Sequence, residues 1–287
     1  MNLIEKAQPI VEIPISSPDY PVEWKSLTDA PPMIYARGNI DLLKGRKFTV
    51  VGARRTPAPA LKLGARICKE LSESVSIVTG TADGGDGAAV EGALSGGGKV
   101  ICVLAGGFSA IPQASVQLLS EVAKRGLLLS PYPYDTEVRA FSYEYRNKLL
   151  ASLGEGVLVL GAAEKSGALI TAKYAAAMGK KLFAIPYAPS VLAGAGCNQL
   201  IKNGAYLTET ANDILEKYGY EGVEKKKIPL TETEEKAVEF ITERGEAHVS
   251  EISSALNIPT YRLATMLSAL EVKGAVVKLG GNRYSVV

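Results

Sequence analysis

Short apolar runs alternate with stretches of helical spacing over most of the chain. The runs are mostly non-alternating in polarity and bounded by Gly or Pro, and they fall at residues 47–52, 75–80, 99–107, 126–130, 156–162 and 180–186. Helical stretches lie between them, from about residue 86 onward and at residues 58–73, 113–125, 141–153 and 167–179. Strands that are apolar along their whole length are typical of a parallel sheet covered on both faces. The pattern therefore predicts an α/β fold, a Rossmann-like domain with a doubly wound, mostly parallel sheet.

The C-terminal part of the chain has a different pattern. A charge run followed by a proline marks residues 223–230 as a linker, and three helical segments follow at residues 231–245, 249–257 and 258–274. Two further predicted strands flank the turn Gly280–Asn282. Three helices followed by a hairpin are the winged-helix arrangement. We therefore expect a Rossmann-like domain over residues 1–222, with residues 1–45 packed on it as an extension, and a small winged-helix domain over residues 231–287.

The composition limits the classes of protein that fit this sequence. With 287 residues, 47% of them hydrophobic and 22% charged, the chain has the balance of an ordinary globular protein. Its three cysteines, Cys68, Cys102 and Cys197, lack the CxxC spacing of a zinc site and suit a reducing compartment. Pro9 interrupts what would be the apolar core of a signal peptide, and no run reaches the ~20 apolar residues of a membrane-spanning helix. We therefore expect a cytoplasmic protein with no membrane contact, no metal and no cofactor.

Histidine-based catalysis would depend on a single residue. His248 is the one histidine in the sequence, and it lies in the predicted C-terminal domain. A Ser-His-Asp arrangement needs a base that titrates near neutral pH, so it would have to use this residue. An ordinary surface or helix-start histidine is the simpler interpretation, so we do not expect histidine-based catalysis.

Net charge does not indicate a partner by itself. The chain carries a net charge of +2; residues 229–287 have six Lys and Arg against eight Glu, and the rest has 26 Lys and Arg against 22 Asp and Glu. Neither balance is a strong electrostatic footprint. An anionic partner must therefore be held by a local cluster of side chains.

The segments that directly follow the predicted strands are the candidate ligand-binding residues, because ligands of doubly wound sheets bind beyond the carboxyl ends of the strands. These segments are residues 52–55, 80–86, 105–112, 161–168 and 186–196. Arg54 and Arg55 follow the strand-ending Gly52, and a planar guanidinium binds phosphate through two charge-assisted bonds. Ser166 and Gly167 open a predicted helix, where free N–H groups can receive a phosphate. A plain N-cap role for Ser166 is compatible with this interpretation.

Residues 79–94, TGTADGGDGAAVEGAL, contain five glycines and two aspartates. Glycine at this density indicates a backbone that approaches another group closely. Carboxylates would repel a phosphate, so we interpret Asp86 as the N-cap of the following helix, where it consumes N–H donors. The loop, with Gly80 and Gly84, then forms the floor of a groove in which the arginines supply the affinity for anions. Asp83 either pairs with one of these arginines or faces solvent.

Six motifs occur together in the order and spacing of a known family: DYPVEWKSLTDAPPMIYARGN, VVGARR, IVTGTADGGDGAAVEGAL, YEYRNKLLA, SGALITAKYAA and NQLIKNGA. On these motifs, residues 18–210 resemble the DNA-processing protein A family, DprA or Smf, as a member without the helical domain that precedes the fold in several others. The resemblance implies an extended Rossmann fold that binds single-stranded DNA without catalysis. It also implies protection of incoming DNA in natural transformation, loading of the recombinase RecA, and dimerisation through the Rossmann domain.

The resemblance also assigns site residues. It carries Arg54 to the family's DNA-contacting arginine, and Arg146, Asn147 and Lys148 to its Arg-Asn-Arg motif. Tyr143 and Tyr145 flank Arg146 as candidates for base stacking, but residues two apart on a helix do not share a face, so at most one should stack. The predicted DNA-binding residues are Gly52, Arg54, Arg55, Gly80, Gly84, Arg146, Asn147, Lys148, Ser166 and Gly167.

Several positions depart from the family pattern, which marks the chain as a divergent member. The positions, with the usual family residue in parentheses, are Ala53 (Ser), Val90 (His), Pro131 (Glu), Tyr143 (Phe), Lys148 (Arg) and Tyr187 (Gly).

Other interpretations stay open for both domains. Nucleotide phosphoribohydrolases resemble the larger domain in strand order, but their PGGxGTxxE signature is absent and AGGFSAIP at residues 105–112 lacks its acid. The residues do not exclude a sensor domain that holds a nucleotide-derived small molecule in the same crevice. In the C-terminal domain, the predicted recognition helix has Arg262 and Lys273 against Glu271, so we favour protein docking or a structural role over duplex binding.

Overall fold

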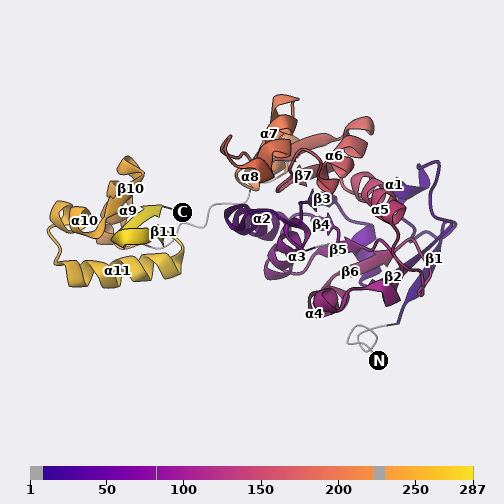
Figure 1. The fold of residues 1–287 in the computed structure, drawn as a ribbon. Helices are drawn as coiled ribbons and strands as arrows, with labels where there is room; N and C mark the ends of the chain where they lie inside the picture. Colours follow the sequence, from indigo (N-terminus) through magenta and orange to yellow (C-terminus); the bar gives the residue numbers. More distant parts are fainter. Residues whose placement is uncertain (1–8, 82, 221, 223–229, 287) are drawn as a thin grey trace. The chain divides into compact units, whose positions relative to one another are not determined.

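A sheet of nine strands forms the centre of the larger unit in the part of the chain that the structure describes (Figure 1). The computed structural model describes residues 9–81, 83–220, 222 and 230–286. The strand order is β1-β2-β6-β5-β4-β3-β7-β8-β9. The strands are β1 (Val11–Pro14), β2 (Met33–Gly38), β3 (Lys47–Val51), β4 (Ser76–Thr79), β5 (Val100–Val103), β6 (Leu127–Ser130), β7 (Gly156–Val159), β8 (Lys181–Ala184) and β9 (Tyr206–Leu207).

The sheet is parallel over most of its width, as the apolar runs predicted. Strands β6, β5, β4, β3, β7, β8 and β9 pair in parallel, whereas β2 is antiparallel to both β1 and β6. Every residue of β3, β4, β5, β6 and β7 is buried. Strands covered on both faces need no polar side, and this is why their sequences do not alternate. The prediction of a doubly wound α/β fold is confirmed.

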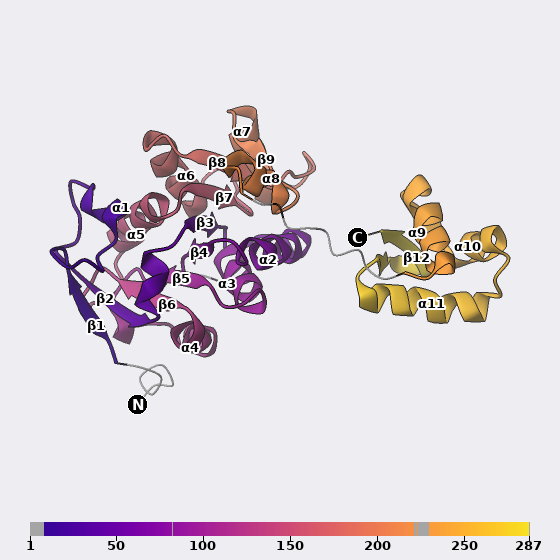
Figure 2. The ribbon, with the colours of Figure 1, turned by 180° about the vertical axis from the view of Figure 1, so that it is seen from behind.

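Helices cover both faces of this sheet (Figure 2). The helices of the larger unit are α1 (Val22–Lys25), α2 (Ala58–Leu71), α3 (Gly85–Ser95), α4 (Val116–Arg125), α5 (Ala140–Leu153), α6 (Gly167–Ala177), α7 (Ala195–Lys202) and α8 (Asn212–Leu215). Buried residues of α2, α3, α4 and α8 share one hydrophobic core, and those of α1, α5, α6 and α7 share the other. None of the helices in the described ranges is long and apolar enough to cross a bilayer.

The N-terminal segment is built into the sheet itself. Strands β1 and β2 extend the sheet beyond β6, and the sequence pattern did not predict them. The Trp24 side chain is fully buried, and its indole N–H donates to the carbonyl of Leu149 over 3.0 Å. The hydroxyl of Tyr20 donates to the carbonyl of Pro31 over 2.7 Å. This segment therefore completes one core instead of lying on the surface of a finished domain.

The direction of chain travel reverses between β3 and β7. From β3 the chain proceeds through β4 and β5 to β6 on one side, and it then returns to β7 and β8 on the other side of β3. In doubly wound sheets the loops at the carboxyl ends of the strands separate at such a point and leave a crevice. The loops that follow β3 and β7 are therefore the expected walls of a ligand site.

The smaller unit contains the elements that the C-terminal pattern predicted. By contacts the chain divides into Met1–Val223 and Glu224–Val287, and most of the predicted linker, residues 223–230, lies outside the described residues. The elements are α9 (Glu232–Arg244), β10 (Glu246–His248), α10 (Val249–Leu256), α11 (Thr260–Lys273), β11 (Val276–Lys278) and β12 (Arg283–Val286). The three helices and the hairpin agree with the prediction, and β10 joins the hairpin in a sheet of order β10-β12-β11. The assignment of this unit to the winged-helix class stays a prediction.

His248 has the plain role that its sequence context indicated. It is the N-cap of α10, and its Nδ1 atom accepts the backbone N–H of Ser250 over 3.2 Å. Glu251 completes a capping box by accepting the N–H of His248 over 2.6 Å. These bonds satisfy donors that the first turn of a helix leaves free.

Candidate nucleic-acid interface

Two cavities lie side by side at the carboxyl edge of the sheet and share two lining residues, Arg54 and Tyr143. The first, here called the switch-point cavity, has a volume of about 290 Å³. It is lined by Val51, Gly52, Ala53, Arg54, Asp86, Tyr143, Arg146, Asn147, Leu150, Ser166, Gly167, Ala168 and Thr171. The second, here called the loop cavity, has a volume of about 320 Å³ and is lined by residues that follow β4 and β5 together with Arg54, Val138 and Tyr143. Arg54 and Tyr143 therefore stand at the boundary between the two cavities.

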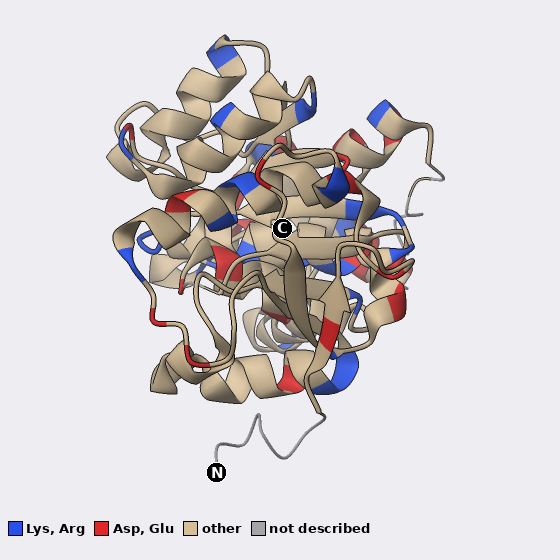
Figure 3. Cartoon of the chain, turned by 90° about the vertical axis from the view of Figure 1, so that its right-hand side faces the viewer, with Lys and Arg blue, Asp and Glu red and all other residues tan. Residues whose placement is uncertain are grey.

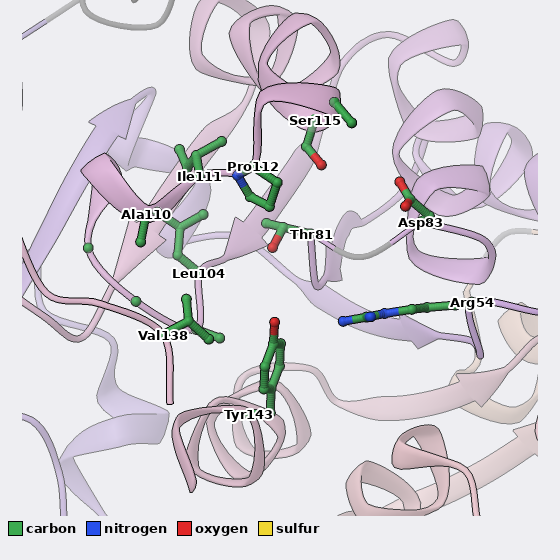
Figure 4. A pocket seen from close by; sticks show the side chains of 14 residues that line it. Arg54, Thr81, Asp83, Leu104, Ala110, Ile111, Pro112, Ser115, Val138 and Tyr143 are labelled. Carbon is green, nitrogen blue, oxygen red and sulfur yellow. The ribbon is translucent and has the colours of Figure 1, made fainter. Parts of the chain in front are cut away.

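Arg54 is exposed on the turn directly after β3. Figure 4 shows its side chain extending across the loop cavity toward Tyr143, with Thr81 and Asp83 nearby. The guanidinium carbon lies 5.9 Å from the centroid of the Tyr143 ring. The strand-end position predicted from the sequence thus places one cation at the edge where ligands of such folds bind.

The glycine loop supports the turn of Arg54 from below. Gly84 has a φ of +78°, and a Cβ there would lie 2.4 Å from the carbonyl oxygen of Ala53 and 2.6 Å from that of Arg54. A Cβ on Gly52 would lie 2.7 Å from the Cα of Gly85. Only glycine permits approaches this close together with a positive φ. The close packing that the glycines indicated is observed at Gly52 and Gly84, and the role of the loop as the floor of a binding groove stays a prediction.

Asp86 is not the N-cap that we predicted. Helix α3 begins at Gly85, its N-cap position is Gly84, and no side chain caps it. Because α3 already begins at Gly85, Asp86 lies inside its first turn. Its side chain is 5% exposed, and its Oδ1 atom accepts the backbone N–H of Gly52 over 3.2 Å. The carboxylate therefore ties α3 to the end of β3, and the N–H of Gly52 already has an acceptor within the protein.

Arg146 lies near Arg54 but does not share its exposure. Its side chain is 5% exposed, and it donates from Nη1 to the carbonyl of Val103 over 3.0 Å and from Nε to Oδ1 of Asn147 over 3.2 Å. Burial lowers the pKa of Arg146, and the carboxylate of Asp86 acts in the opposite direction. Arg146, which we predicted to bind DNA, lines the switch-point cavity, but its guanidinium is buried and directed at the end of β5.

The Arg146, Asn147 and Lys148 triplet separates into three environments. Asn147 lines the switch-point cavity and donates from Nδ2 to the carbonyl of Gly167 over 3.2 Å. Lys148 forms an ion pair with Asp29 over 2.6 Å and lines neither cavity. Residues 146 and 148 are about 200° apart around a helix, so they point to different sides. Lys148 is therefore removed from the site, contrary to prediction.

The remaining predicted residues also differ in position. Ser166 is the N-cap of α6, where its Oγ atom accepts the N–H of Ala168 over 3.3 Å, and it lines the switch-point cavity with Gly167. Gly80 lies beneath the site, since a Cβ there would lie 2.2 Å from Oδ2 of Asp86. Arg55 is exposed on the same turn as Arg54 but lines neither cavity.

Of the two tyrosines on α5, only Tyr143 faces the cavities, as the helical spacing required. Its ring is shared by Arg54 and Arg146, whose guanidinium carbons each lie 5.9 Å from its centroid. The hydroxyl of Tyr145 instead donates to the carbonyl of Asp29 over 2.7 Å. Burial raises the pKa of Tyr145 to about 12.

Several walls of the loop cavity were absent from the predicted residues. Leu104, Ile111, Pro112 and Val138 supply apolar surface, and Thr81, Asp83 and Ser115 supply polar groups. Residues 105–112 were marked as a segment that follows a strand, but no residue of it was singled out because none is charged. Within the described residues, no group of three or more His, Cys, Asp or Glu side chains could hold a metal ion.

Charge over the molecule as a whole does not select this site. In the view of Figure 3, Lys and Arg are interspersed with Asp and Glu along the ribbon. A site for an anion here would therefore depend on the local geometry around Arg54 and the N-terminus of α6.

Comparisons with known proteins agree with these motifs and with this fold. The family model described as DNA recombination-mediator protein A matches residues 12–219. The DNA processing protein DprA of Bacillus subtilis is 38% identical over 214 residues, which are 74% of this chain and 72% of that protein. The DNA processing protein DprA of Streptococcus pneumoniae is 36% identical over 204 residues, or 70% of this chain and 72% of that protein.

Solved structures support the same relationship. The X-ray structure of DprA from Streptococcus pneumoniae has a TM-score of 0.70 and 33% identity, and it covers 76% of this chain and 77% of its own. A structure of DprA from Helicobacter pylori, described in terms of that protein's single-stranded DNA binding mode, has a TM-score of 0.68 and 26% identity. It covers 77% of this chain and 100% of its own. With the motifs and the shared fold, these matches show that the chain belongs to the DNA recombination-mediator protein A family, DprA or Smf.

Proposed function

We propose that this protein binds single-stranded DNA across the two cavities at the carboxyl edge of its sheet. One observation carries the proposal: Arg54 and Tyr143 are exposed together on the boundary that the cavities share. Single-strand-binding sites combine cations for the phosphates with aromatic rings on which bases stack. Here one residue of each kind meets at the switch point of a doubly wound sheet.

The switch-point cavity is suited to a phosphate. Ser166 and Gly167 form the N-terminal end of α6, an 11-residue helix. The N-terminus of a helix favours an anion through its free N–H groups and its dipole. A Cβ on Gly167 would meet nothing within 4 Å, so the approach to this helix end is open.

The loop cavity is suited to a base. Its apolar wall consists of Leu104, Ile111, Pro112 and Val138, and Tyr143 forms one side (Figure 4). Thr81 and Ser115 add hydroxyl groups that both donate and accept hydrogen bonds. A cavity of this kind accepts any base face, which fits binding without strict sequence preference.

Family membership supports a place for this binding in DNA processing. We propose that the protein protects incoming single strands in natural transformation, loads a RecA-type recombinase onto them, and acts as a homodimer through its larger unit. The relatives described above are DNA processing proteins, and the matched family is named for recombination mediation.

The smaller unit fits protein docking or a structural role better than duplex binding. Lys273 of α11 donates to both carboxylate oxygens of Glu234, over 2.7 and 2.8 Å. Arg262 lies over the ring of Tyr261, 5.8 Å from its centroid. Lys273 is thus paired inside the unit, and a duplex-binding helix needs cations that can release counterions.

A fluorescence titration tests the proposed function. We expect a labelled oligothymidine to bind more tightly than a matched duplex, with affinity that rises from one to about six nucleotides. The logarithm of affinity should fall with the logarithm of salt concentration, with a slope that reflects a few phosphates. Affinity already saturated by a mononucleotide would instead indicate a small-molecule sensor, and preference for the duplex would contradict the proposal.

A further inference from the structure

Two oppositely charged side chains lie buried beneath the turn that carries Arg54. Asp86 and Arg146 are each 5% exposed, and both line the switch-point cavity. A Cβ added to Gly80 would lie 2.2 Å from Oδ2 of Asp86 and 2.5 Å from Nη1 of Arg146. The two charged groups are therefore close neighbours, and a side chain at position 80 would displace one of them.

The carboxylate of Asp86 stabilises the turn at this site, but it also repels anions. By accepting the N–H of Gly52, its carboxylate holds the main chain two residues before Arg54. The same carboxylate would repel a phosphate in the cavity that it lines. Like charges a few ångströms apart repel each other strongly near a protein surface, where water screens them only in part.

Arg146 is placed to cancel that repulsion and is held away from the solvent. Its donors point to Val103 at the end of β5 and to Asn147, its neighbour on α5. A guanidinium that clamps a phosphate presents its planar fork to the ligand, and the exposed Arg54, which extends into the loop cavity, is placed for such a contact. Arg146 instead directs two of its donors to internal acceptors.

We propose that Arg146 is a positioning residue that acts through Asp86 and does not contact the bound strand. It neutralises the carboxylate that fixes the Gly52–Arg54 turn, so that a phosphate can approach this turn. The inference rests on the proposed binding of single-stranded DNA at this site. It assigns the direct cationic contact to Arg54 and makes Arg146 the partner of Asp86.

A double-mutant cycle in the full chain tests this assignment. The variants are Arg146→Met, which keeps an unbranched side chain of similar length, Asp86→Asn, which keeps an acceptor for the N–H of Gly52, and the two combined. The probe is a labelled oligothymidine of about 20 nucleotides, longer than the site of common single-strand-binding folds, titrated at several salt concentrations.

The proposal predicts a distinct affinity for single-stranded DNA for each of the three variants. We expect Arg146→Met to weaken binding by about tenfold, within the range of coupling seen between neighbouring charges. The double variant should return to within about threefold of the parent, with the salt slope of the parent, because no uncompensated charge remains. Asp86→Asn alone should bind at least as tightly as the parent.

Other outcomes would overturn the proposal. If the double variant binds as weakly as Arg146→Met and both have a reduced salt slope, Arg146 contacts a phosphate directly. If the melting temperature falls in Arg146→Met while the affinity of the folded protein is unchanged, the pair is only structural. Should Arg146→Met fail to fold, weaker binding by Asp86→Asn would still contradict the assignment.

A separate variant distinguishes failure of the inference from failure of the proposed function. Arg54→Gln removes the exposed cation and leaves Asp86 and Arg146 in place. If the parent does not bind the probe, or if Arg54→Gln binds as the parent does, the proposed function itself is wrong. If Arg54→Gln weakens binding and the cycle shows no rescue, only the role assigned to Arg146 is wrong.

Discussion

Cations lie over tyrosine rings at both ends of the strands of the large sheet, here called the carboxyl edge and the amino edge. The surroundings of these contacts differ. At the carboxyl edge, Arg54 lies 5.9 Å from the centroid of Tyr143, and both residues line open cavities. At the amino edge, Arg46 lies 4.3 Å from the centroid of Tyr220 and precedes the first residue of β3. The contact between Arg46 and Tyr220 is thus the closer of the two, although neither of its residues lines one of these cavities.

The amino edge is filled by aromatic packing. Tyr218 and Tyr220 stack with centroids 5.6 Å apart at 24°, and Lys181 lies 4.6 Å from the centroid of Tyr218. The fully buried Phe183 packs against Phe48 and Tyr218 at 5.6 and 6.2 Å. Burial raises the pKa of Tyr218 to about 12. Arg46 and Lys181 therefore pack against the rings of a hydrophobic cluster. We infer that a cation–π contact indicates a ligand site only where the ring also borders a cavity.

The largest expected effect is on the filled edge. Phe183→Ala should lower the free energy of unfolding by about 3–5 kcal/mol, because it leaves a cavity inside the aromatic cluster. Denaturant unfolding at 25 °C measures the change. The affinity of the folded variant for single-stranded DNA should match that of the parent, because Phe183 lines neither cavity.

Leu192→Ala is the matched control, since Leu192 is 78% exposed and its truncation should cost under about 0.5 kcal/mol. A large drop in DNA affinity in Phe183→Ala would break the contrast between the edges.

The next effect concerns the ring at the open edge. Tyr143→Ala should weaken binding of single-stranded DNA by about 1–3 kcal/mol, the usual contribution of one stacked base. Fluorescence anisotropy with labelled oligothymidine measures this change. Tyr143→Phe keeps the stacking face and should bind within about twofold of the parent. Equal affinities for the alanine variant and the parent would show that Tyr143 does not stack.

The smallest expected effect is the difference in DNA binding between variants of two arginines, Arg54 and Arg46. Arg54→Gln should weaken binding by about tenfold, or about 1.4 kcal/mol, and reduce the salt slope by about 0.7 for each phosphate that the side chain neutralises in the parent. Arg46→Gln removes the same charge from the amino edge and should leave that slope unchanged. Parallel titrations over a range of salt concentrations give both values. Equal changes in the two variants would mean that binding responds to net charge and has no defined site.

The strands and helices of the larger unit were predictable because their signals are local. Glycine and proline bound each apolar run, and the observed core strands lie inside the predicted ranges. Helical spacing alone did not give the buried face of α2, which consists of Ala60, Gly64, Ile67, Cys68 and Leu71. Gly64 is buried because Leu160 approaches it, and a Cβ there would lie 2.5 Å from Cδ1 of that side chain. Helical spacing marks a face, but the neighbour across the interface decides its centre.

Strands β1, β2 and β9 escaped prediction for a related reason. Strand β9 has two residues, Tyr206 and Leu207, too few to form a pattern. Strands β1 and β2 pair with each other, and β2 pairs with β6, which lies far along the chain at Leu127–Ser130. A strand that exists by pairing with a distant partner has a weak local signal.

By itself the sequence determined the parallel sheet, the division of its elements and the place of Arg54, because apolar periodicity and the position after a strand are properties of neighbouring residues. The tertiary structure alone decided that Arg146 is buried, that Lys148 turns to Asp29, and that Asp86 accepts the N–H of Gly52 instead of capping its own helix. Each of these arrangements joins elements far apart in the sequence. Whether a guanidinium faces solvent or a buried carboxylate depends on how the helices pack on the sheet. The local pattern of apolar and polar residues does not encode this packing.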